Sequence, residues 1–132
     1  MASNDNMTAQ EYKIYREPKK VNKYGVAPKA QRYYDGIFYD SKAEMKYAMN
    51  LDLLKLIGDV EKWEYHTTYE LEVNGEKIGT YELDFKVFYK DGTIKYIDVK
   101  GNHAGLPWQM YLLKKKLMKA IYNITIEEEF NY

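Results

Sequence analysis

Residues 81–100, YELDFKVFYKDGTIKYIDVK, decide the fold. Apolar and polar side chains alternate along Tyr81–Tyr89 and again along Thr93–Lys100. Alternation at every second position is typical of strands that are buried on one face. Lys90-Asp91-Gly92 between the two segments has the composition of a tight turn. The stretch therefore predicts two antiparallel strands joined by a short connection.

The length of that connection determines which side chains face each other. A two-residue Asp91-Gly92 turn would place Asp84 and Asp98 on opposite faces of the sheet. A three-residue Lys90-Asp91-Gly92 turn, with its glycine in the left-handed conformation, pairs Asp84 with Asp98 across the strands. Both registers are open at this point, and only the second makes the aspartates neighbours.

Outward from this stretch, the sequence predicts two further hairpins. Asp35-Gly36 lies between two aromatic stretches and indicates a short hairpin. Asn74-Gly75 follows a β-prone segment, Glu61–Val73, and precedes a strand that begins at about Ile78. A last strand at Ile124–Glu127 could join the same sheet.

Two helices are also expected. The first begins at Asp40 or Ser41 and ends at Ile57, before a glycine, and the second runs from Pro107 to about Tyr122. The residues expected to face the core are Tyr47, Ala48, Leu51 and Leu54 in the first helix and Met110, Leu113, Leu117 and Ile121 in the second. The order of elements predicts an α/β fold with a central sheet covered by helices on both faces.

Composition sets the size and class of the protein. A chain of 132 residues, 45% of them hydrophobic, suffices for one domain with one core, expected at residues 23–132. Residues 1–22 are polar and basic and are expected to form a flexible arm. The formal net charge is zero, which argues against bulk coating of nucleic acid.

The absence of cysteine excludes disulfides and thiolate metal sites and fits a reducing compartment. No apolar run approaches the roughly 20 residues that a bilayer span needs, and the N-terminus has no secretory signal. We therefore expect a soluble, cytoplasmic protein without membrane contact.

Four residues are candidates for catalysis: Glu44 on the buried side of the first helix, Asp84 in mid-strand, and Asp98 and Lys100 at the end of the next strand. Two carboxylates facing each other are unfavourable unless a cation or a shared proton lies between them. Oxygen ligands suit Mg²⁺ or Mn²⁺, which would activate a water molecule and neutralise phosphate charge, while Lys100 positions that water. Glu44 could complete the metal shell.

The spacing of Asp84, Asp98-Val99-Lys100 and the helical Glu44 resembles the PD-(D/E)XK nuclease superfamily, although Leu83 stands where that family has proline. Segments 23–25, 35–37, 38–44 and 98–101 also resemble small phage-encoded endonucleases related to Holliday-junction resolvases. The resemblance covers residues 23 to about 126.

The resemblance implies a restriction-endonuclease-like core with a mixed, mostly antiparallel sheet. It implies metal binding by Asp84, Asp98 and the backbone carbonyl of Val99, catalysis by Lys100 and support from Glu44. It further implies a homodimer that cuts branched DNA in phage recombination or replication, in the cytoplasm of a bacterial host. The basic residues considered for DNA contact are Lys23, Arg32, Lys42, His103, Lys115 and Lys116.

Other interpretations remain for each candidate. Ser41 and Glu44 match a capping box, in which Glu44 has a purely structural role. Asp98 and Lys100 could form an ordinary surface ion pair. For the whole chain, the alternative is a nuclease-derived fold that binds DNA or a protein without cutting. A restriction or transposition nuclease is less consistent with so short a chain.

Overall fold

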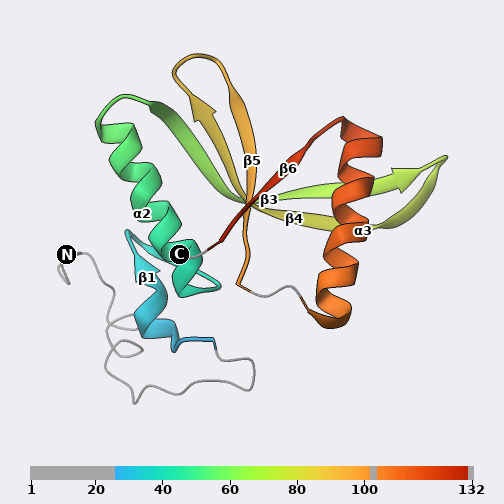
Figure 1. Ribbon diagram of the computed structural model, residues 1–132, viewed down its shortest axis with the longest axis horizontal. Helices are drawn as coiled ribbons and strands as arrows, with labels where there is room; N and C mark the ends of the chain where they lie inside the picture. Colours follow the sequence, from blue (N-terminus) through green and yellow to red (C-terminus); the bar gives the residue numbers. More distant parts are fainter. Residues whose placement is uncertain (1–25, 102–103, 131–132) are drawn as a thin grey trace. The chain divides into compact units, whose positions relative to one another are not determined.

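The computed structural model describes residues 26–101 and 104–130, and Figure 1 shows its elements. Within these residues the fold is α/β, with a mixed four-stranded sheet, a separate two-stranded sheet and two α-helices. The chain divides into two compact units, one ending at Asn50 and the other beginning at Leu51. The basic arm expected over residues 1–22 lies outside the described residues. The single nuclease domain expected over residues 23–132 stays a prediction.

In the N-terminal unit, a 3-10 helix, η2 (Lys29–Arg32), leads into the short hairpin of β1 (Tyr33–Tyr34) and β2 (Ile37–Phe38). Asp35 and Gly36 have φ angles of 49° and 84°. A two-residue turn with both residues left-handed matches the twist of antiparallel strands. The predicted Asp35-Gly36 hairpin is confirmed.

Helix α2 (Lys42–Leu56) follows the hairpin. The Oγ of Ser41 accepts a hydrogen bond from the backbone N–H of Glu44 at 3.1 Å, which satisfies one of the amides left unpaired at a helix start. Gly58, with φ of 96°, lies just past the helix end, as expected. The buried residues of the helix are Glu44, Tyr47, Ala48 and Leu51, and Leu54 is half-buried.

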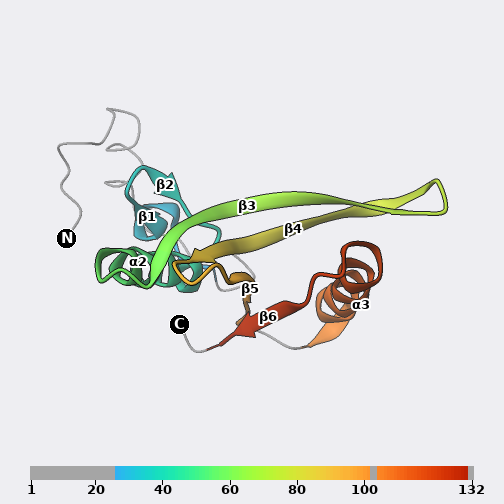
Figure 2. The same ribbon diagram turned by 90° about the horizontal axis from the view of Figure 1, so that it is seen from above.

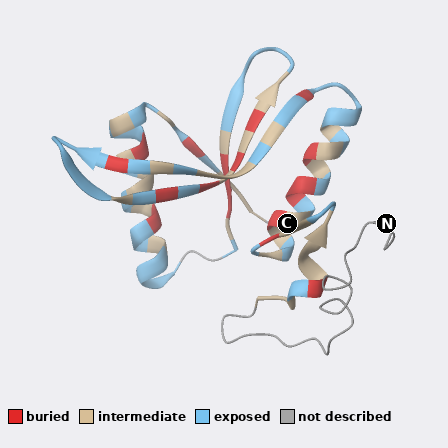
Figure 3. Ribbon diagram, turned by 180° about the vertical axis from the view of Figure 1, so that it is seen from behind, coloured by how far each residue is buried: buried red, intermediate tan, exposed pale blue. Residues whose placement is uncertain are grey.

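A long hairpin dominates the C-terminal unit. Strands β3 (Val60–Val73) and β4 (Glu76–Tyr89) pair along almost their whole length and run side by side in Figure 2. Asn74 and Gly75 both have positive φ, so the predicted turn is confirmed. Buried residues alternate with more exposed ones along β4 from Tyr81 to Val87 (Figure 3).

The other two strands complete the sheet in the order β3-β4-β5-β6. Strand β5 (Ile94–Val99) is antiparallel to β4, and β6 (Ile126–Glu129) is parallel to β5. The N–H of Tyr89 donates to the carbonyl of Thr93 at 2.8 Å, and Gly92 has φ of 91°. The connection is therefore the three-residue turn, and its register places Asp84 opposite Asp98.

Helix α3 (Gly105–Tyr122) connects the parallel strands β5 and β6. It begins two residues before Pro107, which occupies its first turn as expected. Its buried residues, Tyr111 and Met118, pack in one core cluster with Leu71, Tyr81, Leu83 and Ile126. None of the helices in the described part of the chain combines the length and apolar character that crossing a membrane requires.

The core face predicted for α3 is wrong in its first half. Met110 and Leu113 are 45% and 50% exposed, and only Leu117 and Ile121 of the predicted stripe pack against the core. Successive helical residues are rotated by about 100°, so a stripe one position away points in a different direction. The helix has apolar residues on two sides, and periodicity alone does not distinguish them.

Candidate active site

Asp84 and Asp98 lie together where the pairing of β4 with β5 ends. The paired residues run from Phe88 and Ile94 to Phe85 and Ile97. Beyond them, Asp98 Oδ1 accepts the backbone N–H of Asp84 at 3.1 Å, and Asp84 Oδ2 accepts the backbone N–H of Val99 at 2.9 Å. Each carboxylate is thus fixed by a backbone N–H of the neighbouring strand.

Asp98 is buried, with 1% of its surface exposed. A buried carboxylate is costly unless polar groups surround it. Its Oδ2 accepts a hydrogen bond from the hydroxyl of Tyr81 and lies 3.4 Å from Lys100 Nζ. The ion pair is therefore not the exposed surface pair that the sequence left open.

The Tyr81 hydroxyl is held in its protonated form. Burial, followed by the charge of Asp98 and the hydrogen bond to it, raises the pKa of Tyr81 far above its usual value. The phenol therefore remains a donor to Asp98 at every pH at which a protein is normally studied. Strand alternation had placed this side chain on the face opposite Asp84, so the contact was not predicted.

Lys100 is held from two sides. Its ammonium group lies 3.7 Å from the centre of the Tyr111 ring, and its backbone N–H donates to the carbonyl of Glu129 at 2.8 Å. A cation over an aromatic face is attracted by the ring's negative electrostatic potential. Tyr111 in turn donates to Glu128 at 2.6 Å. Burial and then this hydrogen bond raise the pKa of Tyr111.

These groups line a pocket of about 290 Å³. The lining residues that matter most for charge are the carboxylates Glu82, Asp84 and Asp98 and the lysines Lys100 and Lys114. Helix α3 closes one side with Pro107, Met110 and Tyr111. The lining thus has three carboxylates and two lysines, one of which is paired with Asp98.

The donor set fits a hard divalent cation. Two carboxylates in one pocket, those of Asp84 and Asp98, are the oxygen ligands that Mg²⁺ and Mn²⁺ prefer. A carboxylate offers about four lone-pair positions, so oxygens that already accept hydrogen bonds can also bind a metal. The two aspartates at the place where the pairing of β4 with β5 ends could therefore hold such an ion.

Glu44 belongs to the N-terminal unit, whereas Asp84, Asp98 and Lys100 are brought together in the C-terminal unit. Its carboxylate accepts a hydrogen bond from the Ser41 hydroxyl at 2.9 Å. The Ser41 Oγ also accepts the backbone N–H of Glu44, which caps the start of α2. The Ser41 half of the expected capping box is present, but the Glu44 carboxylate accepts the Ser41 hydroxyl, and the part of Glu44 in catalysis stays a prediction.

The basic residues considered for DNA contact have different surroundings. Lys23 and His103 lie outside the described residues. Arg32 donates to the backbone carbonyls of Tyr39 and Asp40 at 2.8 and 3.1 Å. Lys42 and Lys116 are exposed.

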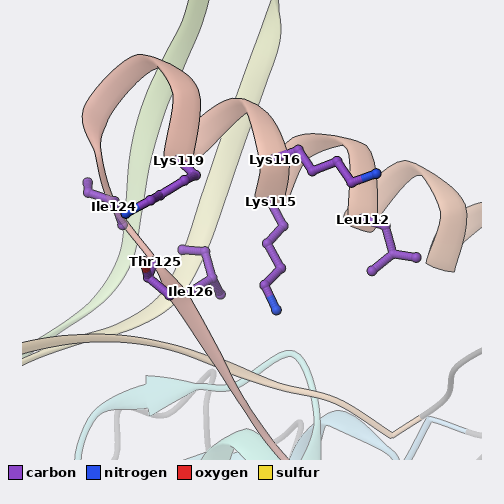
Figure 4. A pocket seen from close by; sticks show the side chains of 7 residues that line it. All are labelled: Leu112, Lys115, Lys116, Lys119, Ile124, Thr125 and Ile126. Atoms are coloured by element: carbon purple, nitrogen blue, oxygen red, sulfur yellow. The ribbon is translucent and has the colours of Figure 1, made fainter.

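Lys115 forms an ion pair with Glu128. With Lys116 and Lys119 it lines a second pocket, of about 430 Å³, between α3 and β6 (Figure 4). The two pockets share no lining residue. Lys115 and Lys116 are therefore not part of the pocket around Asp98.

Six residues of the pocket were missed as site residues from the sequence: Tyr81, Glu82, Pro107, Met110, Tyr111 and Lys114. Alternation along the strand separates Tyr81 from Asp84. A buried tyrosine hydroxyl usually needs a polar partner, and that requirement is the one sequence feature that could have connected Tyr81 to a nearby carboxylate. Predicting Tyr111 and Lys114 would have required knowing which face of α3 turns toward the sheet, and the spacing of apolar residues does not determine that face.

The sequence family described as "Protein of unknown function (DUF1064)" matches residues 11–128. This match covers most of the chain, and the chain belongs to that family. No curated protein and no solved structure matches the sequence significantly.

Proposed function

We propose that this member of the DUF1064 family is a metal-dependent DNA endonuclease with a restriction-endonuclease-like core, and that its active site is the pocket around Asp84, Asp98 and Lys100. The observation that carries the proposal is the mutual fixation of the two aspartates across β4 and β5, next to a lysine. Together with the PD-(D/E)XK spacing of these residues, it supports phosphodiester hydrolysis over a purely structural role.

Asp84, Asp98 and the Val99 carbonyl would hold Mg²⁺ or Mn²⁺. Such an ion, when bound, lowers the pKa of a coordinated water and offsets charge on the phosphate. Tyr81 keeps the Asp98 carboxylate oriented through its hydrogen bond. Lys100, placed by Asp98 and the Tyr111 ring, donates a hydrogen bond to the attacking water or to a phosphate oxygen. Lys114 adds positive charge for the DNA backbone.

The test is cleavage of supercoiled plasmid and of a synthetic four-way junction with Mg²⁺ or Mn²⁺. Asp84→Asn, Asp98→Asn and Lys100→Met should each lower the cleavage rate by about 100-fold or more, because each removes charge from the reacting centre. Matched controls are Glu72→Gln and Lys90→Met, which change exposed residues that do not line the pocket. These two variants should cut like the unmodified protein.

The cleavage assay also separates the proposal from its rival. If the folded, unmodified protein cuts neither DNA with either metal, the endonuclease proposal is wrong. Binding of DNA without cleavage in that experiment would favour a non-cutting DNA-binding module. Cleavage that is unaffected by Asp98→Asn would place the active site elsewhere.

The substrate and the assembly follow from the resemblance. We expect a homodimer that prefers branched over linear DNA, as suits phage recombination or replication. Comparing four-way, flap and linear duplex substrates tests the preference. Sedimentation velocity of the full chain tests the dimer.

A further inference from the structure

Helix α3 has a second apolar stripe, which borders its core face. Leu106, Met110 and Leu113 are 72%, 45% and 50% exposed, and the half-buried Leu117, which also packs against the core, ends the row. At about 100° per residue, the centre of this row lies about 120° around the helix from Tyr111 and Met118, which pack in the core. Large apolar side chains grouped on one exposed face indicate an interaction surface.

The spacing of the stripe is that of a helix–helix seam. Its residues follow one another at intervals of four, three and four, which are the a and d positions of a heptad repeat. A narrow seam of this kind fits one partner helix, whereas a helix that lies on a membrane needs a broader apolar face.

The charges beside the seam identify the partner's chemistry. In the heptad set by Met110 and Leu113, Lys114 and Lys116 occupy the flanking e and g positions. Helix α3 contains four lysines and no acidic residue. Two copies of α3 packed together would bring lysine against lysine, so a second copy of this helix is disfavoured.

We propose that the surface formed by Leu106, Met110, Leu113 and Leu117 docks an amphipathic helix of another protein, with apolar residues along its seam and glutamate or aspartate on both flanks. Opposite charges at the flanking positions select the partner and its orientation. Met110 and Lys114 also line the pocket around Asp98, so the docked helix lies beside that pocket. The inference does not depend on nuclease activity.

The experiment uses the full chain and two fluorescent synthetic helices. Both have leucine at every a and d position, and they differ in having glutamate or lysine at every e and g position. Fluorescence anisotropy should show saturable binding of the glutamate helix and at least about tenfold weaker binding of the lysine helix. Raising the salt concentration should weaken the glutamate complex.

Variants locate the binding surface. Leu113→Glu should weaken binding of the glutamate helix at least about tenfold, since it places a charge in the apolar seam. Lys116→Glu should reduce the preference for glutamate over lysine. Ile78→Glu, which changes an exposed apolar residue of β4, is the matched control and should have no effect. Thermal melts of each variant establish that it is folded.

Several results would overturn the proposal. Equal binding of the two helices, or binding that Leu113→Glu leaves unchanged, would show that the seam does not select an acidic partner. A dimer of the unmodified protein that Leu113→Glu dissociates would make a second copy the occupant. Binding to phosphatidylserine vesicles without binding to either helix would identify a lipid surface instead.

Discussion

Replacing Tyr81 with phenylalanine should destabilise the fold by a measurable amount. The change removes one hydroxyl, which donates to the buried carboxylate of Asp98. Hydrogen bonds to charged groups contribute about 1.5–3 kcal/mol to stability. With 1% of Asp98 exposed, water cannot replace the lost donor. We expect the free energy of unfolding to fall by about 2 kcal/mol, which for a domain of this size lowers Tm by roughly 8 °C.

Tyr69→Phe is the matched control. Tyr69 is the cross-strand partner of Tyr81 in β3 and packs against the same core cluster. Its hydroxyl is buried and has no hydrogen-bond partner within the described residues. Removing a buried polar atom without a partner should leave stability unchanged or raise it by up to about 1 kcal/mol. The same substitution, tyrosine to phenylalanine, should therefore change the free energy of unfolding differently at the two positions.

Urea unfolding followed by circular dichroism measures both changes, with the slope on denaturant expected to stay constant. A double-mutant cycle between Tyr81→Phe and Asp98→Asn should give a coupling of roughly 1 kcal/mol or more, because the residues are in direct contact. Equal losses for Tyr81→Phe and Tyr69→Phe, or a coupling near zero, would refute this account of Asp98.

Three further changes test other parts of the fold by the same titration. Met118→Ala, in the core, should cost about 2–5 kcal/mol, whereas Leu113→Ala, on the exposed stripe, should cost less than about 0.5 kcal/mol; similar losses would contradict the assignment of the two faces of α3. Gly92→Ala should cost about 1 kcal/mol or more, because φ of 91° is unfavourable for any residue with a β-carbon; no loss would exclude the left-handed turn. Burial alone would raise the pKa of Glu128, but the hydrogen bond from Lys115 and other contacts lower it below its usual 4.5. The stability that the ionised Glu128 contributes is therefore complete above pH 4.5 and is lost as the pH falls through the lower pKa of the folded state. The difference in unfolding free energy between the unmodified protein and Glu128→Gln should shrink in acid. A difference that stays constant with pH would refute this role of Glu128.

Most of the elements were predictable because their boundaries depend on local chemistry. Asn74-Gly75 required a tight turn, and Ser41 supplied a helix cap, whatever the rest of the chain did. The register of β4 on β5 was different. Both candidate registers keep the apolar residues of each strand on one face of that strand, and both turns can have a left-handed glycine. The conformation of Asp91, which is not left-handed, and the bond between Tyr89 and Thr93 distinguish them.

The rotation of α3 was not predictable from the helix alone. Its sequence offers two apolar rows, one through Tyr111 and Met118 and one through Met110 and Leu113. The core contains the first row because Tyr111 and Met118 complete a cluster with residues of β3, β4 and β6. Contacts between elements far apart in the sequence therefore decide which lysines of α3 lie at the candidate site.

Asp84 and Asp98 stabilise the sheet in addition to their proposed catalytic role. This second role determines which substitutions can test catalysis. Where the pairing of β4 with β5 ends, the Asp84 carboxylate accepts a hydrogen bond from the backbone N–H of Val99, and the Asp98 carboxylate accepts one from the backbone N–H of Asp84. Alanine at either position would leave a buried amide without an acceptor, at a cost of about 1–3 kcal/mol. Asparagine keeps one carbonyl acceptor and removes the charge. A loss of cleavage in Asp98→Asn at nearly unchanged stability would therefore report on metal binding and catalysis, whereas the same loss in Asp98→Ala would not separate chemistry from unfolding.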